Sequence, residues 1–474
     1  MVFNSAIFFL FFISILFLYW RLFAQNLRSR NLFLIAASLF FYGWWDWRFV
    51  GLWMFTALTD FFVARQIDKK PEKGKNYLLI SIAVNLSVLG FFKYYNFFAD
   101  SFAQLLQAFN LHVSVSTLQI VLPVGISFYT FQALSYTIDV YRKKISAEQS
   151  ALTYLAFISF FPQLVAGPIE RAQHMLPQFR SEKKIDYVLF KTGVAFILWG
   201  LFKKVVIADN LALFVDQVFD HNENYSGSTN IVAALFFTIQ IYCDFSGYSD
   251  IAIGTARLMG FELSQNFNHP YFSSSFQNFW TRWHISLSTW FRDYLYIPLG
   301  GNRKGKVREY FNLLLTFLIS GLWHGANITF VIWGALHGVY ICIEKLFGNK
   351  LKLPAFFKSL FVFCCVSFAW IFFRGHNFGE CLLFIKNMLA GNSGGFLLQN
   401  LQNIYSQVSY GTLFFIPLLF FLFVESAMFV KKKSPFDLAG NGKIIKAAFY
   451  YSLLAGILLF GVFNNAPSFI YFQF

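Results

Sequence analysis

The sequence predicts an all-α, polytopic integral membrane protein with roughly 10–12 spanning helices and further re-entrant or interfacial helices around a central tunnel. Three observations predict this class. Of the 474 residues, 57% are hydrophobic, 13% are charged and 67 are Phe, more apolar surface than a soluble core can bury. Apolar runs of about 20 residues, the length that crosses a bilayer, recur from end to end. Ionisable residues inside some of these runs indicate a lined cavity. We expect one domain over residues 1–474, with its motif core at about 120–345.

The net charge of +15 is concentrated in particular loops. Lys and Arg gather in cytoplasmic loops of membrane proteins, so this charge predicts topology and argues against a nucleic-acid partner. The basic segments are 65–75, 142–144, 303–308, 345–358 and 431–433. The segments without Lys or Arg are 96–119, 220–231, 392–409 and 464–474. Their alternation predicts basic loops in the cytoplasm and both termini outside.

The amino terminus predicts a retained spanning helix. Residues 1–20 carry no charged side chain, and Arg21, Arg28 and Arg30 follow them. A basic n-region and a small-x-small cleavage site are both missing, which argues against a signal peptide. Further spans are expected at 32–42, 50–64 and 77–92, with Trp-rich residues 44–47 at the membrane interface.

Three stretches before residue 220 depart from simple spans. Residues 121–142 carry Pro, Gly, Ser, Gln and Asp among apolar residues, and residues 151–171 end in VAGPIER, where Gly-Pro stops a helix. Residues 188–219 form a long helical stretch interrupted by Lys203 and Lys204. We therefore expect a bend or an interfacial portion at the two lysines.

Residues 231–260 bring two acids into an apolar helix. Asp244 and Asp250 lie roughly 120° apart around a helix of 3.6 residues per turn, so they are not a paired-carboxylate site. Asp250 and Arg257 share a face, so Arg257 could neutralise Asp250 through an intermediary. Two interpretations stay open for the polar residues of this stretch: they line a tunnel, or they make helix–helix hydrogen bonds.

Residues 279–294, FWTRWHISLSTWFRDY, are too polar for a lipid-facing span. On a continuous helix, Trp280, His284 and Ser288 share one face, while Arg282 and Asp293 share another. This pattern predicts a re-entrant or interfacial helix on the cytoplasmic side, near the basic segment 303–308. The alternative is an aromatic-belt anchor with snorkelling arginines.

His324 lies within an apolar region, 311–343, that contains no Lys, Arg, Asp or Glu. An ionisable side chain in such a region indicates a functional site. Gly321, Gly325 and Asn327 are expected to break the helix around it, which is tolerated only where protein or water covers the freed backbone. His337 follows 13 residues later. The alternative for each histidine is a core residue that bonds a neighbour's carbonyl. The remaining spans are expected at 311–319, 328–343, 356–373, 413–430 and 447–463.

Familiar hydrolase, kinase and metalloprotease motifs are missing from the sequence. It has no GxSxG, P-loop or HExxH, and its five cysteines show neither disulfide nor zinc spacing. What is left is buried histidine, acids, hydroxyls and tryptophans beside basic loops. A histidine can remove a proton from an attacking hydroxyl near neutral pH, which contributes roughly 10²–10⁴ in rate.

These motifs resemble those of the membrane-bound O-acyltransferase family, and within it the bacterial branch that O-acetylates alginate or peptidoglycan. The segments that carry the resemblance are VLPVGISFYTFQALSYTIDVYR, LVAGPIER, YCDFSGYSDIAIG, NFNHPYFSSSFQNFWTRWHISLSTWFRDYLYIPLGGNRKG, SGLWHGANITFVIWGALHG and the terminal FIYFQF. The resemblance covers most of residues 3–345, together with the terminal FIYFQF. These segments are specific for the family and much less specific for the polymer.

The resemblance implies that His324 is the catalytic base and that His284 is a second histidine of the same channel. It implies acetyl-CoA as the cytoplasmic donor substrate, no tightly bound cofactor, and an extracytoplasmic polysaccharide acceptor. It also implies a separate extracytoplasmic acetyltransferase partner that finishes the transfer. No metal site is expected.

The other candidates form two groups. The expected tunnel-lining residues are Asp244, Ser246, Tyr248, Asp250, Trp280, Trp283, Ser288, Asp293, Ser320, Trp323, Asn327 and His337. The expected basic rim, which would attract the phosphates of the donor, consists of Arg292, Arg303, Lys304, Lys306 and Arg308.

Two alternatives to acetyl transfer stay open. The nearer one is D-alanyl transfer to teichoic acid from a carrier-protein thioester. The other is a polysaccharide or lipid transporter, although the internal repeats expected of one are not found. Ser320, one turn before His324, also raises the possibility of an acyl-enzyme. We expect direct attack by the acceptor hydroxyl instead, since apolar Leu318, Ile319 and Leu322 offer nothing to orient the base.

Overall fold

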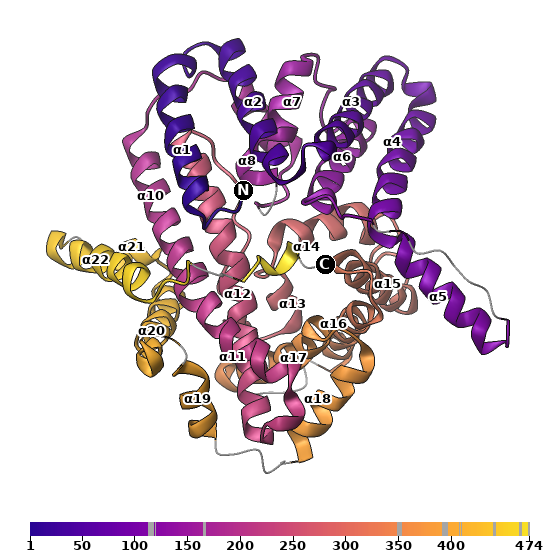
Figure 1. Cartoon of the computed structure of the whole chain (residues 1–474). Coiled ribbons are helices and arrows are strands. Elements are labelled where there is room, and N and C mark those ends of the chain that lie inside the picture. Colours follow the sequence, from indigo (N-terminus) through magenta and orange to yellow (C-terminus); the bar gives the residue numbers. More distant parts are fainter. Residues whose placement is uncertain are drawn as a thin grey trace. The chain divides into compact units, whose positions relative to one another are not determined.

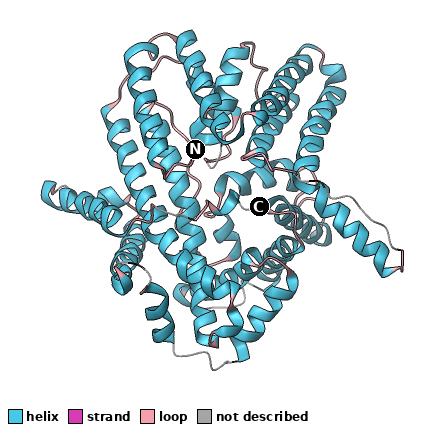
Figure 2. Cartoon of the chain, viewed as in Figure 1, coloured by secondary structure: helices cyan, strands magenta, loops and turns pink. Residues whose placement is uncertain are grey.

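The computed structural model describes the chain apart from residues 112–117, 119, 165–166, 348–352, 391–396, 407, 409, 439–441, 464–466 and 473–474. In the described residues all regular structure is helical, which confirms the all-α prediction (Figure 2). The chain divides into two compact units. Unit 1 is Met1–Lys191 with Thr255–Ser264, and unit 2 is Thr192–Gly254 with Gln265–Phe474. The single domain expected over 1–474 stays a prediction.

Unit 1 is a layer of apolar helices (Figure 1). Its elements are α1 (Ala6–Leu18), α2 (Leu27–Asp46), α3 (Arg48–Lys69), α4 (Gly74–Leu89), α5 (Tyr95–Ala108), α6 (Ile126–Tyr141), α7 (Ala151–Ser159), α8 (Phe161–Leu164) and α9 (Ala172–Arg180). Side-chain caps fix several starts: Ser5 begins α1, Asn26 begins α2 and Ser150 begins α7, each accepting a backbone N–H of the first turn.

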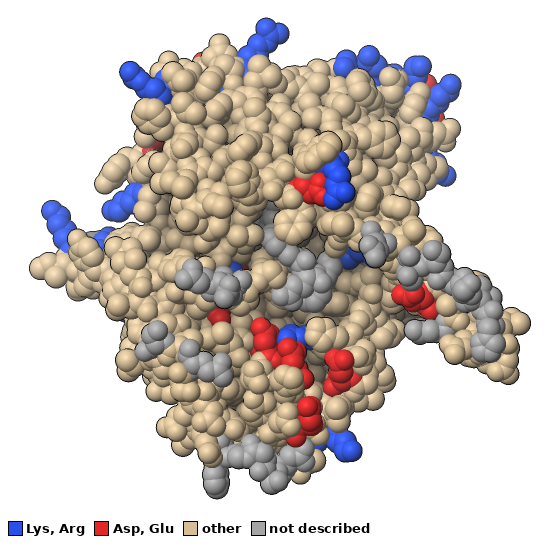
Figure 3. All heavy atoms as spheres, in the orientation of Figure 1, with Lys and Arg blue, Asp and Glu red and all other residues tan. Residues whose placement is uncertain are grey.

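Basic side chains gather along one edge of unit 1. Figure 3 shows Lys and Arg along the upper edge in that view, where Figure 1 draws the turns that join α1 to α2 and α3 to α4. The second of these turns belongs to the basic segment 65–75. One edge of this unit therefore carries basic loops, as the positive-inside rule expects of a cytoplasmic edge.

Unit 2 contains most of the candidate site residues. Helix α10 (Tyr187–Leu201) leads into it, and α12 (Gly227–Leu258) leads out of it. Its other elements are a π-helical segment η4 (Phe202–Ala208), α11 (Asp209–Asp220), α13 (Phe276–Trp280), α14 (Ile285–Phe291), a second π-helical segment η7 (Arg292–Tyr296), α15 (Lys306–His324), α16 (Ile328–Phe347), α17 (Ala355–Arg374), α18 (Phe378–Ala390), α19 (Leu397–Tyr405), α20 (Phe415–Lys431), α21 (Pro435–Leu438), α22 (Lys443–Phe460) and η9 (Ile470–Phe472).

Close packing of α15 on α16 places the His324 end of α15. A Cβ atom on Gly321 would lie 2.2 Å from the carbonyl oxygen of Phe330, and one on Gly334 would lie 2.2 Å from that of Phe317. Only glycine fits at these two positions, as is common where membrane helices pack. The expected break at Gly321 is therefore wrong, because α15 continues through it to His324.

Seven helices among the described residues are long and apolar enough to span a membrane. They lie at Ala6–Phe23, Pro71–Ala108, Gly227–Leu258, Ile328–Phe347, Ala355–Arg374, Gly411–Lys431 and Lys443–Phe460. The polytopic prediction is thus confirmed. Other long helices, such as α2, α3 and α15, carry more polar or charged residues, so the expected total of ten to twelve spans stays a prediction.

Candidate active site

His324 is the last residue of α15. The chain leaves the helix at Gly325, whose backbone is extended, with φ −156° and ψ 146°. Asn327 fixes the following turn: its Nδ2 donates to the carbonyl of His376 at 2.6 Å, and its Oδ1 accepts the N–H of Thr329 at 3.1 Å. Asn327 is therefore the cap of α16, which is a structural role its motif position did not reveal.

The His324 ring is 5% exposed and lies among aromatic rings of unit 2. Its centroid is 4.9 Å from that of Trp333, 5.5 Å from Phe373 and 5.6 Å from Tyr471. The ring of His284 lies 6.5 Å away. The structure thus brings together the two histidines that sequence analysis singled out, 40 residues apart, in one aromatic pocket.

His284 joins α13 to α14 with a left-handed backbone, φ 42° and ψ 55°. Such a backbone is costly for a residue other than glycine and persists only where the surroundings fix it. Asn266 supplies part of that constraint, because its Oδ1 accepts the N–H of Ser286 at 3.2 Å and lies 3.2 Å from Nδ1 of His284. Since Oδ1 can only accept, Nδ1 of His284 donates, which leaves Nε2 in the acceptor form.

The continuous helix predicted over 279–294 is wrong. The left-handed backbone at His284 divides it into two short helices, so Trp280, His284 and Ser288 do not form a stripe along one helix face. Ser288 donates to the carbonyl of Trp283 at 3.1 Å, and Asp293 pairs with Arg292 at 2.8 Å. Periodicity assumed uniform dihedrals, which this backbone does not have.

The C-terminal segment reaches the same pocket. The N–H of Ile470 donates to Oδ2 of Asp244 at 2.8 Å, which places Tyr471 with its ring 4.3 Å from Phe245 and 6.2 Å from His284. The Tyr471 hydroxyl is buried and has no hydrogen-bond partner among the described residues. Sequence analysis quoted FIYFQF as part of a resemblance and assigned Tyr471 no role, because chain position alone did not connect it with His324.

Five charged side chains, four of them buried and Asp250 partly exposed, form what we call the lysine–aspartate cluster: Lys203, Lys204, Asp209, Asp244 and Asp250. Lys203 pairs with Asp250 at 2.6 Å, and Lys204 pairs with Asp209 at 2.7 Å and Asp244 at 2.6 Å. The lysines are 3% and 1% exposed, and the π-helical segment η4 interrupts the α-helical stretch at them. Whether this portion lies at the membrane interface stays a prediction. Asp250 pairs with Lys203, and its neutralisation by Arg257 through an intermediary stays a prediction.

The remaining lining candidates have varied surroundings. Ser246 accepts a hydrogen bond from Lys203 at 2.9 Å, and the Tyr248 ring packs 4.2 Å from Phe469. Trp283 is fully buried, Ser320 is 5% exposed, and Trp323 is half-buried in α15. His337 is fully buried among aromatic rings. A continuous tunnel through these residues stays a prediction.

The expected basic rim is exposed. Its members are Arg292, Arg303, Lys304, Lys306 and Arg308. Lys306 begins α15 and His324 ends it, so 18 helical steps separate them, about 27 Å at 1.5 Å per residue. Lys306 and His324 thus lie at opposite ends of one helix, and any action of this part of the rim on a donor occurs far from the histidine.

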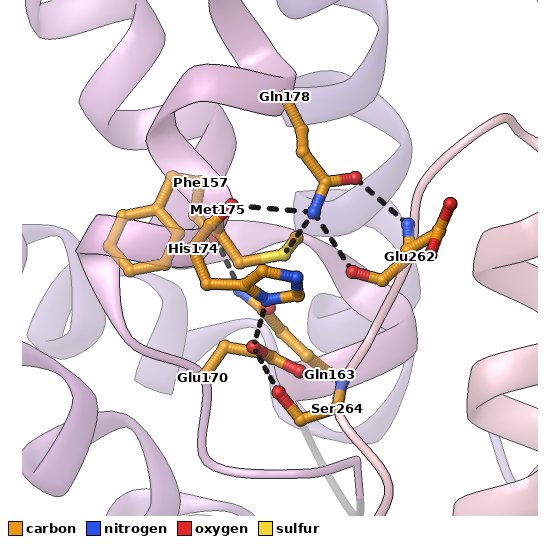
Figure 4. Close-up of polar contacts among 8 residues, drawn as sticks. All are labelled: Phe157, Gln163, Glu170, His174, Met175, Gln178, Glu262 and Ser264. Atoms are coloured by element: carbon orange, nitrogen blue, oxygen red, sulfur yellow. Dashed lines mark hydrogen bonds and ion pairs between the residues drawn. The ribbon is translucent and has the colours of Figure 1, made fainter.

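The AGPIER segment of unit 1 forms a separate polar network (Figure 4). Glu170, 1% exposed, accepts hydrogen bonds from the N–H of Ser264 at 2.5 Å and its hydroxyl at 3.1 Å, and Nδ1 of His174 lies 2.9 Å away. Gln178 exchanges two hydrogen bonds with the backbone of Glu262, at 2.8 and 2.9 Å. This network fastens α9 to the segment after α12. The hydrogen bond from Glu170, followed by the charges of Glu170 and Glu262, raises the pKa of His174.

This arrangement suits group transfer to a hydroxyl. His324 offers an imidazole that can accept a proton, and His284 offers an acceptor nitrogen on a ring whose centre lies 6.5 Å away. The aromatic rings around His324 limit the access of water. Among the described residues, no cluster of three or more His, Cys, Asp and Glu side chains can hold a metal ion.

Comparison with known proteins agrees with this chemistry. A family model described as the membrane-bound O-acyltransferase family matches residues 8–378. A probable alginate O-acetylase AlgI from Pseudomonas putida is 38% identical, with 100% of this chain and 100% of that protein covered. A peptidoglycan O-acetyltransferase from Helicobacter pylori is 36% identical over 83% of this chain and 80% of that protein. A teichoic acid D-alanyltransferase from Bacillus subtilis is 29% identical over 54% of this chain and 69% of that protein.

The family model spans most of the chain, and the similarity to the alginate relative extends over its whole length. These matches establish the resemblance that the motifs indicated. The chain therefore belongs to the membrane-bound O-acyltransferase family and is an integral membrane acyltransferase.

Proposed function

We propose that this protein takes an acetyl group from cytoplasmic acetyl-CoA and delivers it across the membrane for O-acetylation of an extracytoplasmic polysaccharide, such as alginate or peptidoglycan. The observation that carries the proposal is the meeting of His324 and His284 in one buried aromatic pocket. The named O-acetylating relatives, which align over most or all of the chain, support acetyl as the acyl group.

His324 acts as the general base. It accepts the proton of the attacking hydroxyl as the hydroxyl oxygen bonds to the carbonyl carbon of the thioester. The carbon–sulfur bond then breaks, and the leaving thiolate takes up the proton that His324 holds. His284, fixed by Asn266 with Nε2 as an acceptor, orients the hydroxyl. No residue of the chain is consumed in this sequence.

The proposal includes a direction and a partner. The donor enters from the side of the basic rim, both termini lie outside a bacterial inner membrane, and a separate extracytoplasmic acetyltransferase completes the transfer to the polymer. The basic edge of unit 1 supports a cytoplasmic assignment for its loops. Labelling tests the direction: in a chain without native cysteines, Ser228→Cys should react with an impermeant reagent in intact cells, and Val307→Cys only after permeabilisation. The reverse pattern would overturn the direction.

The central test is acetyl transfer to a soluble glycan by the protein reconstituted in vesicles with radiolabelled acetyl-CoA, in the presence of a periplasmic extract that supplies the proposed extracytoplasmic partner. Wild type should transfer label, and His324→Gln, at equal folded amount, should lose nearly all transfer. Activity only with a D-alanyl carrier-protein thioester would favour the teichoic-acid alternative, which the more distant relative represents. The family assignment does not support the transporter alternative. If His324→Gln transfers acetyl at the wild-type rate, the proposed role of His324 as the base is wrong.

A further inference from the structure

A second group of polar side chains lies on the α16 side of His324. We call it the indole chamber and define it by Trp280, Trp333 and His337. The ring of His337 lies 5.0 Å from Trp333 and 5.0 Å from Trp280, and Trp333 lies 4.9 Å from His324. Trp333 and His337 are four residues apart on α16, so they share one helix face. Trp333 therefore contacts both His337 and the proposed base.

The polar atoms of this chamber are buried and unsatisfied. Trp333 and His337 are 0% exposed and Trp280 is 9% exposed. Within the described part of the chain, nothing accepts a hydrogen bond from Nε1 of Trp280 or Trp333, and neither ring nitrogen of His337 has a partner. Buried polar groups in proteins are nearly always paired, so three such side chains together indicate a ligand that pairs with them.

The donors in the chamber select the chemistry of that ligand. An indole N–H can only donate, and a neutral imidazole carries one N–H of its own. The ligand must therefore present a hydrogen-bond acceptor. Residues 311–343, which supply Trp333 and His337, contain no Lys, Arg, Asp or Glu, so a phosphate or carboxylate would meet no compensating charge there. A neutral carbonyl fits these conditions.

Building on the proposed function, we propose that the indole chamber binds the carbonyl oxygen of the acyl thioester and stabilises the negative charge that develops on it. As the acceptor oxygen bonds to the carbonyl carbon, the π electrons of the C=O bond move to that oxygen, where Trp333, beside His324, donates. Trp280 and His337 complete the donor set. When the carbon–sulfur bond breaks, the electron pair returns and the thiolate leaves with the proton held by His324.

The competing explanation is that these rings only fill the core. Trp53 provides a matched control, because it is 1% exposed in α3 of unit 1 and its Nε1 also has no partner among the described residues. Replacement of either tryptophan by phenylalanine removes one buried N–H and keeps an aromatic ring. If the indole chamber is only core, Trp333→Phe and Trp53→Phe should change the protein in the same way.

Kinetics with acetyl-CoA separate the two explanations. Trp333→Phe should lower kcat by roughly 10²-fold, in the range observed for loss of one oxyanion donor, while the Kd for CoA, which has no acyl carbonyl, stays unchanged. His337→Phe and Trp280→Phe should lower kcat by smaller factors, and Trp53→Phe should keep wild-type kcat. If Trp333→Phe and Trp53→Phe have equal kcat in a preparation whose wild type is active, the indole chamber has no catalytic role. That result would leave the proposed function standing.

Infrared spectroscopy gives a readout that packing does not move. The His324→Ala variant keeps the thioester intact, so it can bind acetyl-CoA labelled with ¹³C at the carbonyl. The carbonyl stretch of this bound thioester should absorb at lower frequency than that of the same thioester in water-free solution. Adding Trp333→Phe should reverse the shift, and adding Trp53→Phe should not. A carbonyl frequency that Trp333→Phe leaves unchanged contradicts the inference. A wild-type chain that transfers no acetyl group from acetyl-CoA instead overturns the proposed function.

Discussion

The two buried polar regions of unit 2 are built in opposite ways. In the lysine–aspartate cluster each of the five side chains has an oppositely charged partner at 2.6 or 2.7 Å. In the indole chamber, Trp280, Trp333 and His337 carry buried polar atoms without partners among the described residues. Both sets lie in helices of a membrane protein, where unpaired polar atoms are costly. A buried group with an opposite charge beside it holds the fold together, and buried donors with neither charge nor hydrogen-bond partner indicate where a ligand belongs.

The first prediction concerns the lysine–aspartate cluster. Lys204→Met removes the shared cation from Asp209 and Asp244 and leaves two buried carboxylates unpaired, so we expect a loss of stability of about 3–5 kcal/mol. Thermal unfolding in detergent measures it. The exposed Lys184→Met is the control and should behave as wild type. Adding Asp209→Asn and Asp244→Asn to Lys204→Met should recover part of the loss. An unchanged unfolding temperature for Lys204→Met alone would show that the pairs contribute nothing.

The second prediction concerns the two hydroxyls near His324. Tyr471→Phe removes a buried hydroxyl that has no partner among the described residues and whose ring contacts His324, so acetyl transfer should fall at least about tenfold, equivalent to about 1.4 kcal/mol. Ser320→Ala should keep most activity, since apolar Leu318, Ile319 and Leu322 beside Ser320 offer nothing to orient a base for a serine nucleophile. The measurement is initial rate at equal folded protein. Equal rates for Tyr471→Phe and wild type would limit Tyr471 to packing, and labelled acetyl trapped on Ser320 would contradict direct attack.

The sequence predicted the fold class and singled out His324, because both depend on local composition, whereas the pairing of His284 with His324 was implied only by the resemblance. Long apolar runs specify membrane helices, and an imidazole within 311–343 stands out against residues without charge. It did not predict the division of 279–294 at His284, because a left-handed backbone at a histidine depends on Asn266 and on packing around it. The resemblance supplied the role of His324, and spacing alone did not.

Other features depended on contacts between distant parts of the chain. Lys203 and Lys204 suggested an interface because a lysine in an apolar run usually reaches water, and only the fold shows their aspartate partners. Tyr471 is 147 residues from His324 along the chain, and no periodicity connects them. The unpaired indoles are likewise invisible in sequence, since an unpaired state is a property of the packed structure.

The third prediction extends the comparison to charges that lie in water. Neutralising Arg303, Lys304 and Lys306 together should raise the apparent KM for acetyl-CoA several-fold at low ionic strength, with little change in kcat. The reason is that Lys306 is about 27 Å from His324 along α15, so this part of the rim acts through long-range attraction. At 0.1 M salt, where the Debye length is about 10 Å, the difference should shrink. The matched control neutralises Lys69, Lys70 and Lys73 of unit 1, also exposed. An equal KM in the two triple variants would leave the rim with a topological role only.

The smallest effect is expected where a paired polar group is partly open to water. His174 pairs with Glu170 at 2.9 Å, and its side chain is 45% exposed. Glu170 raises the pKa of His174 above the ordinary value of about 6.5, so the folded state binds this proton more tightly than the unfolded state does. The resulting stability is complete below about pH 6.5 and is lost as pH rises through the folded pKa.

Wild type should therefore lose more thermal stability between about pH 6 and pH 8.5 than His174→Gln, which keeps a hydrogen-bond donor but does not titrate. Because water screens an exposed pair, the difference should be small beside that of Lys204→Met. Parallel pH profiles for the two proteins would mean that the Glu170 network fastens α9 through Ser264 and Gln178 without help from the histidine's charge.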